Sequence, residues 1–241
     1  MVRAMRLSII MPALDEGEGI IAMLDPLADL RTLGVEVVVV DGGSRDATVQ
    51  RARLRVDKVV LSAPRGWVPQ MNAGAEKASG DVLLFLDKDT RLPPAAEHLV
   101  LDGLARSGRA WGRFNVKIEG RDLRLPLLAA FMNLWSRLTG IATGEQAIFV
   151  KRDAFEAAGG FPAIPLMTDV ALCKRLKRVS RPLCLRQRVV VPVRRCGSLG
   201  AFQTALLMWR LRIAFFFGAG PDELAKQWAE AGGKPSVNTG G

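Results

Sequence analysis

The chain has 241 residues and a formal charge of +10, with 49% hydrophobic and 24% charged residues. This composition is that of an ordinary globular protein, and a chain of this length buries enough surface to fold without disulfides or structural metals. The three cysteines, Cys173, Cys184 and Cys196, form no C-x-x-C pair. They therefore predict neither a disulfide framework nor a zinc site, and they favour reduced thiols in a cytoplasmic protein.

The excess of positive charge predicts an anionic partner, such as a phosphorylated small molecule or an anionic lipid. Nucleic acid is not expected, because the chain has no tyrosine, only 6% aromatic residues and no motif typical of nucleic-acid-binding proteins. The apolar run 7–14 is short and contains Pro12, which does not fit a signal peptide. No run approaches the roughly 20 apolar residues of a membrane-spanning helix.

The first half of the chain alternates short apolar runs with segments of helical periodicity. The predicted strands cover residues 7–11, 36–40, 58–61 and 81–86, and the predicted helices cover 19–33, 46–55 and 66–78. This alternation predicts an α/β fold with a doubly wound, mostly parallel sheet and flanking helices. In such sheets ligands bind at the carboxyl ends of the strands, so polar residues at those ends are candidates for a binding site.

The second half of the chain is less regular. Strands are predicted at 111–117, 146–150 and 189–193, and helices at 123–138, 152–158, 170–178 and 201–217. From residue 232 onward the sequence is rich in Gly, Ser, Asn and Thr, which predicts a disordered tail over 232–241.

The first polar cluster, Pro12, Asp15 and Glu16, directly follows the first predicted strand. Carboxylates at this position can accept hydrogen bonds from ribose hydroxyls. The alternative is that the two acids only favour the start of the next helix.

The second cluster begins with Asp41 and continues through Gly42 and Gly43 to Ser44. The glycines allow the backbone to approach a ligand closely, and Asp41 can accept a hydrogen bond from a base N–H. The alternative is a tight turn in which Ser44 or a neighbour caps the following helix.

The third cluster is Asp87-Lys88-Asp89, at the end of the fourth predicted strand. An extended backbone would put the two carboxylates on one face with Lys88 on the other. Paired carboxylates suit Mg²⁺ or Mn²⁺, which prefer oxygen ligands and usually keep substrate phosphates as well. The alternative is an acidic surface turn ahead of Pro93 and Pro94.

These clusters together resemble family 2 glycosyltransferases of the GT-A fold, and look closest to a small bacterial subgroup of them. The resemblance spans residues 7–217 and is carried by SIIMPALDEGEGI, VVVVDGGSRDAT, APRGWVPQMNAGAEKASGDVLLFLDKDT, TGEQAIFVKRDAFEAAGGF and IPLMTDVALCKRLKR. It implies a nucleotide-diphosphate sugar donor of the UDP or GDP type and a divalent metal, Mg²⁺ or Mn²⁺. It also implies one domain over 1–231, with a nucleotide-binding half at 6–90 and an acceptor half at 91–218.

The resemblance assigns roles to particular residues of this chain. The donor-binding positions it implies are Pro12, Asp15, Glu16, Asp41 for the base, Arg65, Gln70, Asn72 and Asp87. Asp89 is the implied metal ligand, with Asp87 beside it. Two positions depart from the family pattern: Thr168 stands where an acid is usual, and Lys88 stands where a small residue is commoner.

The resemblance implies an inverting direct displacement, in which Asp169 takes the proton of an acceptor hydroxyl. The metal on Asp89 neutralises the departing diphosphate. Glu145, in a loop beside Gly144, is the second candidate for the base. Arg194 and Arg195 are expected either to clamp phosphate or to form a solvated basic loop.

Two other features predict a role less directly. His98, the only histidine, is expected on the surface. The segment 201–217 is apolar at helical spacing and contains two arginines. It fits both a helix packed on the sheet and an interfacial helix that brings the enzyme to a lipid-linked acceptor at the inner face of the cell membrane.

Two rival functions follow from the same residues. A sugar nucleotidyltransferase would begin with a Gly-rich G-x-G-x-R loop, which is absent from 12–18. A non-catalytic nucleotide-sugar-binding or membrane-associated module is the rival of another class, and the atypical Thr168 is the feature that favours it.

Overall fold

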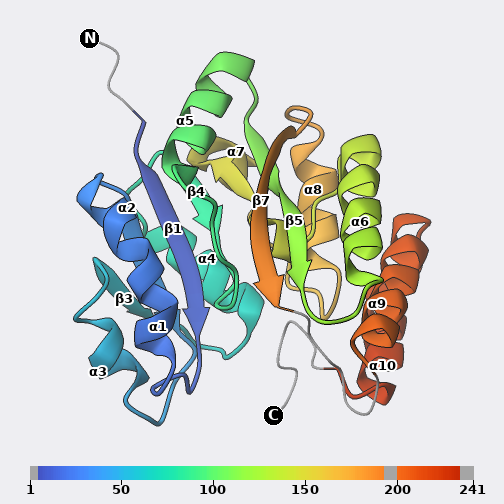
Figure 1. Cartoon of the computed structure of the whole chain (residues 1–241), viewed down its shortest axis with the longest axis horizontal. Coiled ribbons are helices and arrows are strands. Elements are labelled where there is room, and N and C mark those ends of the chain that lie inside the picture. The colour runs from blue at the N-terminus through green and yellow to red at the C-terminus, as the bar shows by residue number, and fades with distance from the viewer. Residues whose placement is uncertain (1–4, 193–199, 234–241) are drawn as a thin grey trace.

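The computed structural model describes residues 5–192 and 200–233. Its centre is a seven-stranded sheet with the order β3-β2-β1-β4-β6-β5-β7 (Figure 1). The strands are β1 Leu7–Ala13, β2 Glu36–Asp41, β3 Lys58–Leu61, β4 Val82–Phe85, β5 Trp111–Glu119, β6 Phe149–Lys151 and β7 Leu183–Pro192. Strands β1 to β4 pair in parallel, as do β5 and β7, whereas β6 is antiparallel to both of its neighbours. The predicted α/β fold with a mostly parallel sheet is confirmed.

The helices lie on both faces of this sheet (Figure 1). They are α1 Ile20–Leu24, α2 Ala28–Thr32, α3 Thr48–Ala52, α4 Trp67–Lys77, α5 Ala96–Ser107, α6 Leu125–Thr139, α7 Arg152–Ala157, α8 Thr168–Leu176, α9 Ala201–Phe216 and α10 Pro221–Glu230, with 3-10 turns η1 Asp25–Leu27 and η2 Gly144–Gln146. No helix within 5–192 or 200–233 is both long and apolar enough to cross a membrane.

The core is divided by the sheet into two clusters, because successive strand residues point to opposite faces. Ile9 and Val37 pack on the side of α1 and α2, whereas Ile10 and Val38 pack on the side of α4. Strands covered on both faces must be apolar throughout, which explains why β1 and β2 appear in the sequence as continuous apolar runs.

Several predicted boundaries are wrong, and the strand predicted at 189–193 begins at Leu183. Three further differences have local reasons. The predicted helix 19–33 is divided into α1, η1 and α2 around Pro26, which has no N–H for a helical hydrogen bond. β1 continues through Pro12, which lies beyond the last β1–β4 pair, Ile10 with Phe85. The predicted strand at 146–150 starts only at Phe149, because η2 occupies the residues before it. Helix α10 is an element that the sequence patterns did not predict.

Candidate functional site

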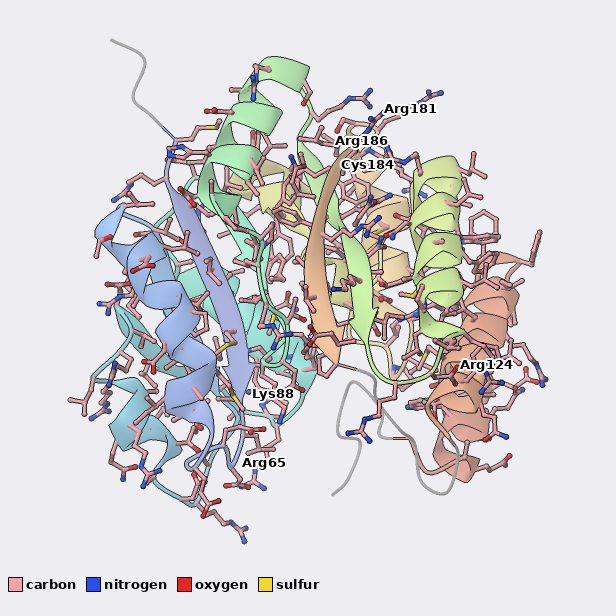
Figure 2. All side chains as sticks on the ribbon, in the orientation of Figure 1. Arg65, Lys88, Arg124, Arg181, Cys184 and Arg186 are labelled. Atoms are coloured by element: carbon pink, nitrogen blue, oxygen red, sulfur yellow. The ribbon has the colours of Figure 1, made fainter. Side chains whose placement is uncertain are left out.

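The candidate site lies along the edge of the sheet where the parallel strands end. In Figure 1 this is the lower edge, at the tips of the β1 and β7 arrows. The loops that follow β1, β2, β3 and β4 meet there, since the carboxyl ends of parallel strands share one edge. Arg65 and Lys88 both lie at this edge (Figure 2).

The loops after β1 and β2 are hydrogen-bonded to each other. An Asp15 carboxylate oxygen accepts from the Arg45 N–H at 2.8 Å, and the Asp15 N–H donates to the Ser44 hydroxyl at 2.9 Å. Two residues farther on, the Gly17 N–H donates to Asp46 at 2.8 Å. Asp15 has φ 51°, a left-handed conformation that is uncommon outside glycine. The two polar clusters predicted to bind the sugar donor are therefore joined into one hydrogen-bonded unit.

Asp41 ends β2 and is 1% exposed. One of its carboxylate oxygens accepts from the Gly43 and Ser44 N–H groups, each at 2.9 Å, and the other accepts from the Ser44 hydroxyl. Gly43 has φ 90°, where a side chain would be strained. Arg65 donates to the Gly43 carbonyl at 2.7 Å, so it too is tied to this turn.

Gln70 and Asn72, both on α4, use their amide groups to hold backbone in place. The Gln70 amide nitrogen donates to the carbonyls of Ala13 at 2.9 Å and Val40 at 2.7 Å, at the ends of β1 and β2. The Asn72 side chain exchanges two hydrogen bonds with the backbone of Phe161, each at 2.9 Å. We assign both residues to the positioning of loops at the site.

The D-x-D segment is not extended, which corrects the expectation that Lys88 faces away from both carboxylates. The Thr90 N–H donates to the Asp87 carbonyl at 2.9 Å, which closes a tight turn over Lys88 and Asp89. Lys88 forms an ion pair with Glu16. The unusual lysine therefore joins the D-x-D turn to the loop after β1.

A groove of about 930 Å³ opens beside this turn. Met23, Leu27 and Leu30 form its apolar wall, and Lys88 and Asp89 line the other side. Small-molecule sites commonly have volumes of roughly 300–1,000 Å³. The D-x-D turn therefore borders a space large enough for a substrate.

The residues at the turn fit a divalent metal only in combination with a substrate. Asp87 and Asp89 offer the hard oxygen ligands that Mg²⁺ and Mn²⁺ prefer, and Mg²⁺ is often held by one or two carboxylates plus substrate phosphates. Among the described residues, no group of three or more His, Cys, Asp or Glu side chains is placed to hold a metal. A metal on Asp87 and Asp89 would therefore take its remaining ligands from water and from the phosphates of a substrate.

A second group of charged residues lies at the start of α8. Asp169 is in the first turn of this helix and accepts a hydrogen bond from the Gly144 N–H at 3.0 Å. Arg212, from α9, lies 3.1 Å from a Glu145 carboxylate oxygen and 3.8 Å from one of Asp169. The two candidate bases, Asp169 and Glu145, are thus brought together by one guanidinium.

Burial determines the electrostatics of this group. The Asp169 and Arg212 side chains are only 14% and 10% exposed. Burial raises the pKa of Asp169 above the ordinary value, Glu145 raises it further, and Arg212 and the Gly144 N–H oppose the rise. For Arg212, burial lowers the pKa, but Glu145 and Asp169 outweigh it, so the net change is upward and the guanidinium stays charged.

Two residues near the Asp169, Glu145 and Arg212 group have an unusual backbone conformation. Ala147, which follows η2, has φ 47°, and Met167, which precedes α8, has φ 65°. Non-glycine residues with such values are rare and tend to occur at functional sites. The Phe85 N–H donates to the Ile148 carbonyl at 2.9 Å, so the η2 loop lies beside the end of β4 and the D-x-D turn that follows it.

Arg212 is a site residue that the sequence patterns did not indicate. Its position in the helix could have indicated this role. Arg212 is three residues after Trp209 and four before Phe216, so it lies on the face of α9 that packs inward. His98 has an exposed side chain, as expected. The predicted phosphate-clamping residues, Arg194 and Arg195, lie outside the described residues.

Residues 8–154 match the family model described as glycosyl transferase family 2. A curated relative is the undecaprenyl-phosphate 4-deoxy-4-formamido-L-arabinose transferase of Pseudomonas syringae pv. syringae (strain B728a). It is 35% identical over 34% of this chain and 30% of its own length. The chain therefore matches less than a third of that relative.

Solved structures show the same fold. The mannosyltransferase PcManGT from Pyrobaculum calidifontis, in complex with GDP-Man and Mn²⁺, has a TM-score of 0.62 and 22% identity, over 95% of this chain and 69% of that chain. S. aureus TarS 1–349, in complex with UDP-GlcNAc, has a TM-score of 0.63 and 19% identity, over 94% and 72%. M. tuberculosis glucosyl-3-phosphoglycerate synthase has a TM-score of 0.58 and 21% identity, over 88% and 80%. The expected GT-A fold is confirmed.

Proposed function

The chain belongs to glycosyl transferase family 2, and from this premise we propose that it moves a sugar from a nucleotide-diphosphate donor to an acceptor hydroxyl. The observation that carries the proposal is that two clusters of carboxylates lie along one edge of the sheet. The D-x-D turn lies beside the loop that contains Glu145, and the Gly144 N–H of that loop donates to Asp169. Three solved neighbours were determined with GDP-Man, UDP-GlcNAc or UDP, which supports a donor of this type.

The donor is held by the unit formed by the loops after β1 and β2. Asp15 and Asp41 support that unit through backbone N–H groups, and Arg65 adds a positive charge near the place where a diphosphate would lie. Asp89, with Asp87, would hold a divalent metal, and two of the neighbours contain Mn²⁺. When bound, such a metal neutralises charge on the departing diphosphate.

Asp169 is the proposed base and Glu145 the second candidate. Arg212 orients both carboxylates, and the Gly144 N–H holds one oxygen of Asp169. The other oxygen accepts from the Val170 N–H at 2.8 Å, so the carboxylate is fixed in the first turn of α8. A proton taken from an acceptor hydroxyl would go to this carboxylate as the hydroxyl oxygen attacks the anomeric carbon. The direct attack would invert the configuration of that carbon.

The acceptor is proposed to be lipid-linked, and the protein to work at the cytoplasmic face of the membrane. The name of the Pseudomonas relative includes undecaprenyl phosphate, which supports an acceptor of this class. An acceptor phosphate would be ionised already at neutral pH and would need no base, whereas an acceptor hydroxyl would. The dependence of transfer on Asp169 therefore separates these two kinds of acceptor group.

The test is a panel of nucleotide-diphosphate sugars, with Mn²⁺, Mg²⁺ or EDTA, in which release of the nucleoside diphosphate is followed. We expect release from a UDP- or GDP-sugar that stops with EDTA and with Asp89→Ala. Asp102→Ala, an exposed acid on α5, is the matched control and should behave as the wild type. Silence across the panel, together with no metal-dependent nucleotide binding, would refute the transferase and favour a non-catalytic module.

A further inference from the structure

The exposed large apolar side chains are concentrated in one region. Within 5–192 and 200–233, twelve such side chains are exposed, and seven of them lie on α6, α9 and the residues that flank them. These seven are Leu123, Leu127, Phe131, Leu134, Leu138, Leu206 and Phe217. Scattered exposed leucines need no explanation, but a contiguous apolar patch marks an interaction site.

Four of these residues form a continuous stripe along α6. Leu127, Phe131, Leu134 and Leu138 are spaced by four, three and four residues, which puts them on one face of the helix. Their exposed fractions are 75%, 43%, 56% and 77%. The buried residues of α6 include Ala129 and Met132 on the opposite side, so α6 is apolar on both faces. A helix that is apolar all round normally has a partner on its outer face.

Helix α9 extends this stripe. Trp209 is 4% exposed and packs edge-on against Phe131 and Trp135 of α6, with ring centroids 5.0 and 5.9 Å apart. Leu206 on α9 and Phe217, which follows this helix, are also exposed. The Trp209 side of α9 is buried against α6, as the core-packing alternative for 201–217 expects. The interfacial alternative stays a prediction, and the exposed apolar surface belongs mainly to α6.

The helices of this surface carry positive charge. Neither α6 nor α9 contains an aspartate or glutamate. Arg124, before the start of α6, stacks on the Phe202 ring of α9 at 4.2 Å and is paired with Asp122 at 2.7 Å. Arg137 on α6 and Arg210 on α9 are exposed. Figure 2 shows Arg124 where α6 meets α9. By contrast, α10 begins with Asp222 and Glu223. An apolar stripe bordered by arginines complements the acyl chains and anionic headgroups of a membrane.

The same helix pair reaches the proposed base. Arg212, three residues after Trp209 on α9, bonds Glu145 and lies beside Asp169. If the outer face of α6 and α9 lies on a bilayer, helix α9 is the element between the lipid and the candidate base. An acceptor anchored in that bilayer would have only a short distance to cover.

We propose that the exposed face of α6, together with the outer edge of α9, docks the protein on an anionic phospholipid surface. The inference rests on the proposed function for its meaning, because a lipid-linked acceptor is the reason to dock. It places the protein on the bilayer by shallow insertion of Leu127, Phe131, Leu134 and Leu138, with Arg137 and Arg210 at the headgroups.

The experiment is co-sedimentation of the full chain with two kinds of vesicle, one of phosphatidylcholine and one of equal parts phosphatidylcholine and phosphatidylglycerol. The test variant is Leu127→Glu/Leu134→Glu. Its matched control is Leu54→Glu/Leu33→Glu, since Leu54 and Leu33 are 80% and 61% exposed and lie outside the stripe. Circular dichroism and thermal unfolding check that both variants are folded, which is expected because all four side chains are exposed.

We expect stronger binding to the anionic vesicles, weakened by salt. The stripe variant should lose roughly tenfold or more in partitioning, since each buried leucine contributes a large part of its transfer free energy. The control should bind as the wild type. The proposal would be overturned if the wild type bound neither vesicle or bound both equally. It would also be overturned if the control variant lost as much vesicle binding as the stripe variant. A wild-type dimer that the stripe variant converts to a monomer would also overturn it, because the face would then be covered by a second copy.

Release of nucleotide from the donor panel, measured without vesicles, keeps this test separate from the proposed function. The stripe variant should release nucleotide at the wild-type rate while failing to bind vesicles. If the wild type binds anionic vesicles but releases nothing from any donor, the transferase proposal fails and the docking surface remains.

Discussion

Two groups of carboxylates lie along one edge of the sheet, and their surroundings differ. In the nucleotide-binding half, Asp15 and Asp46 accept hydrogen bonds from backbone N–H groups of the neighbouring loop, and Asp41 accepts them from its own turn. The pKa of Asp46 is lowered, first by the hydrogen bond from the Thr48 hydroxyl and then by the Gly17 N–H. In the acceptor half, burial raises the pKa of Asp169.

The same residue type therefore serves two purposes in this protein. In the first group the carboxylates shape the loops, and the hydrogen bonds that Asp46 accepts favour its charged form. Burial disfavours the charged form of Asp169, so this carboxylate accepts a proton more readily than Asp46. A residue that must take up a proton during a reaction benefits from that environment, whereas a residue that shapes a loop does not.

The largest expected effect comes from Asp169→Asn, which tests whether the raised pKa belongs to a base. With a hydroxyl acceptor, transfer should fall by roughly 10²–10⁴-fold while donor binding is kept, because asparagine has the size of aspartate but cannot take up the proton. Transfer rates and nucleotide affinity measure the two effects separately. Asp153→Asn, an exposed acid on α7, is the control. Unchanged transfer would point to an ionised acceptor phosphate, and loss with Glu145→Gln instead would move the role to Glu145.

The raised pKa of Asp169 predicts how activity and stability change with pH. Because the folded pKa of Asp169 is above its ordinary value of 3.8, the acid limb of kcat/KM should lie above that value. The same shift lowers stability at higher pH. Because Asp169 binds its proton more tightly in the folded than in the unfolded state, the free energy of unfolding falls as pH rises from 3.8 through the folded pKa. Asp169→Asn should therefore remove this part of the pH dependence of stability, measured by thermal unfolding at acidic and neutral pH.

The next effect in size is that of Arg212→Met, which removes the cation between the buried Asp169 and the partly exposed Glu145. Breaking a buried charge pair costs about 3–5 kcal/mol, because the remaining charges lose their partner. The acid limb of the pH profile should also move to higher pH, since Arg212 opposes the rise in the pKa of Asp169. Urea unfolding and pH–rate profiles measure the two outcomes. Arg210→Met, exposed on the same helix, should change neither one, and a shift there as large as that of Arg212→Met would contradict the bridge.

Gln70→Ala tests whether the nucleotide-binding half depends on loop shape. The substitution leaves the buried carbonyls of Ala13 and Val40 without their amide donor, which should cost about 1–3 kcal/mol of stability. The KM for the donor should rise, since the loops after β1 and β2 start at these residues. Gln50→Ala, exposed on α3, is the control. A stable variant with an unchanged KM would show that the α4 amide does not position the site.

The smallest effect is expected from Lys88→Met. Its ion pair with Glu16 is partly exposed, so the loss of stability should be below about 1 kcal/mol. We expect a rise of a few-fold in the donor KM, because the pair joins the D-x-D turn to the loop after β1. Lys77→Met, which removes an exposed pair with Glu76 away from the site, should leave KM unchanged. A fall in KM would show that Lys88 hinders donor binding.

Local patterns were sufficient for the sheet and most of the strand-end loops. Val37 to Val40 is an apolar run that only a strand covered on both faces explains, and Asp41 with Gly42 and Gly43 marks its end. The predicted geometry of the D-x-D failed, because an alternation rule assumes an extended chain, and here the chain turns at Lys88.

The sequence was therefore sufficient for the order of the strands and for the residue types at the strand ends, since these depend on short-range periodicity and on nearby turns. The family followed from the resemblance of the motifs at those strand ends. Only the tertiary structure decided which charges meet. Arg212 and Glu145 are 67 residues apart and join through the packing of α9 against α6, for which no local pattern exists. The outward stripe of α6 was decided in the same way, because which face of an apolar helix is left uncovered depends on the helices that pack beside it.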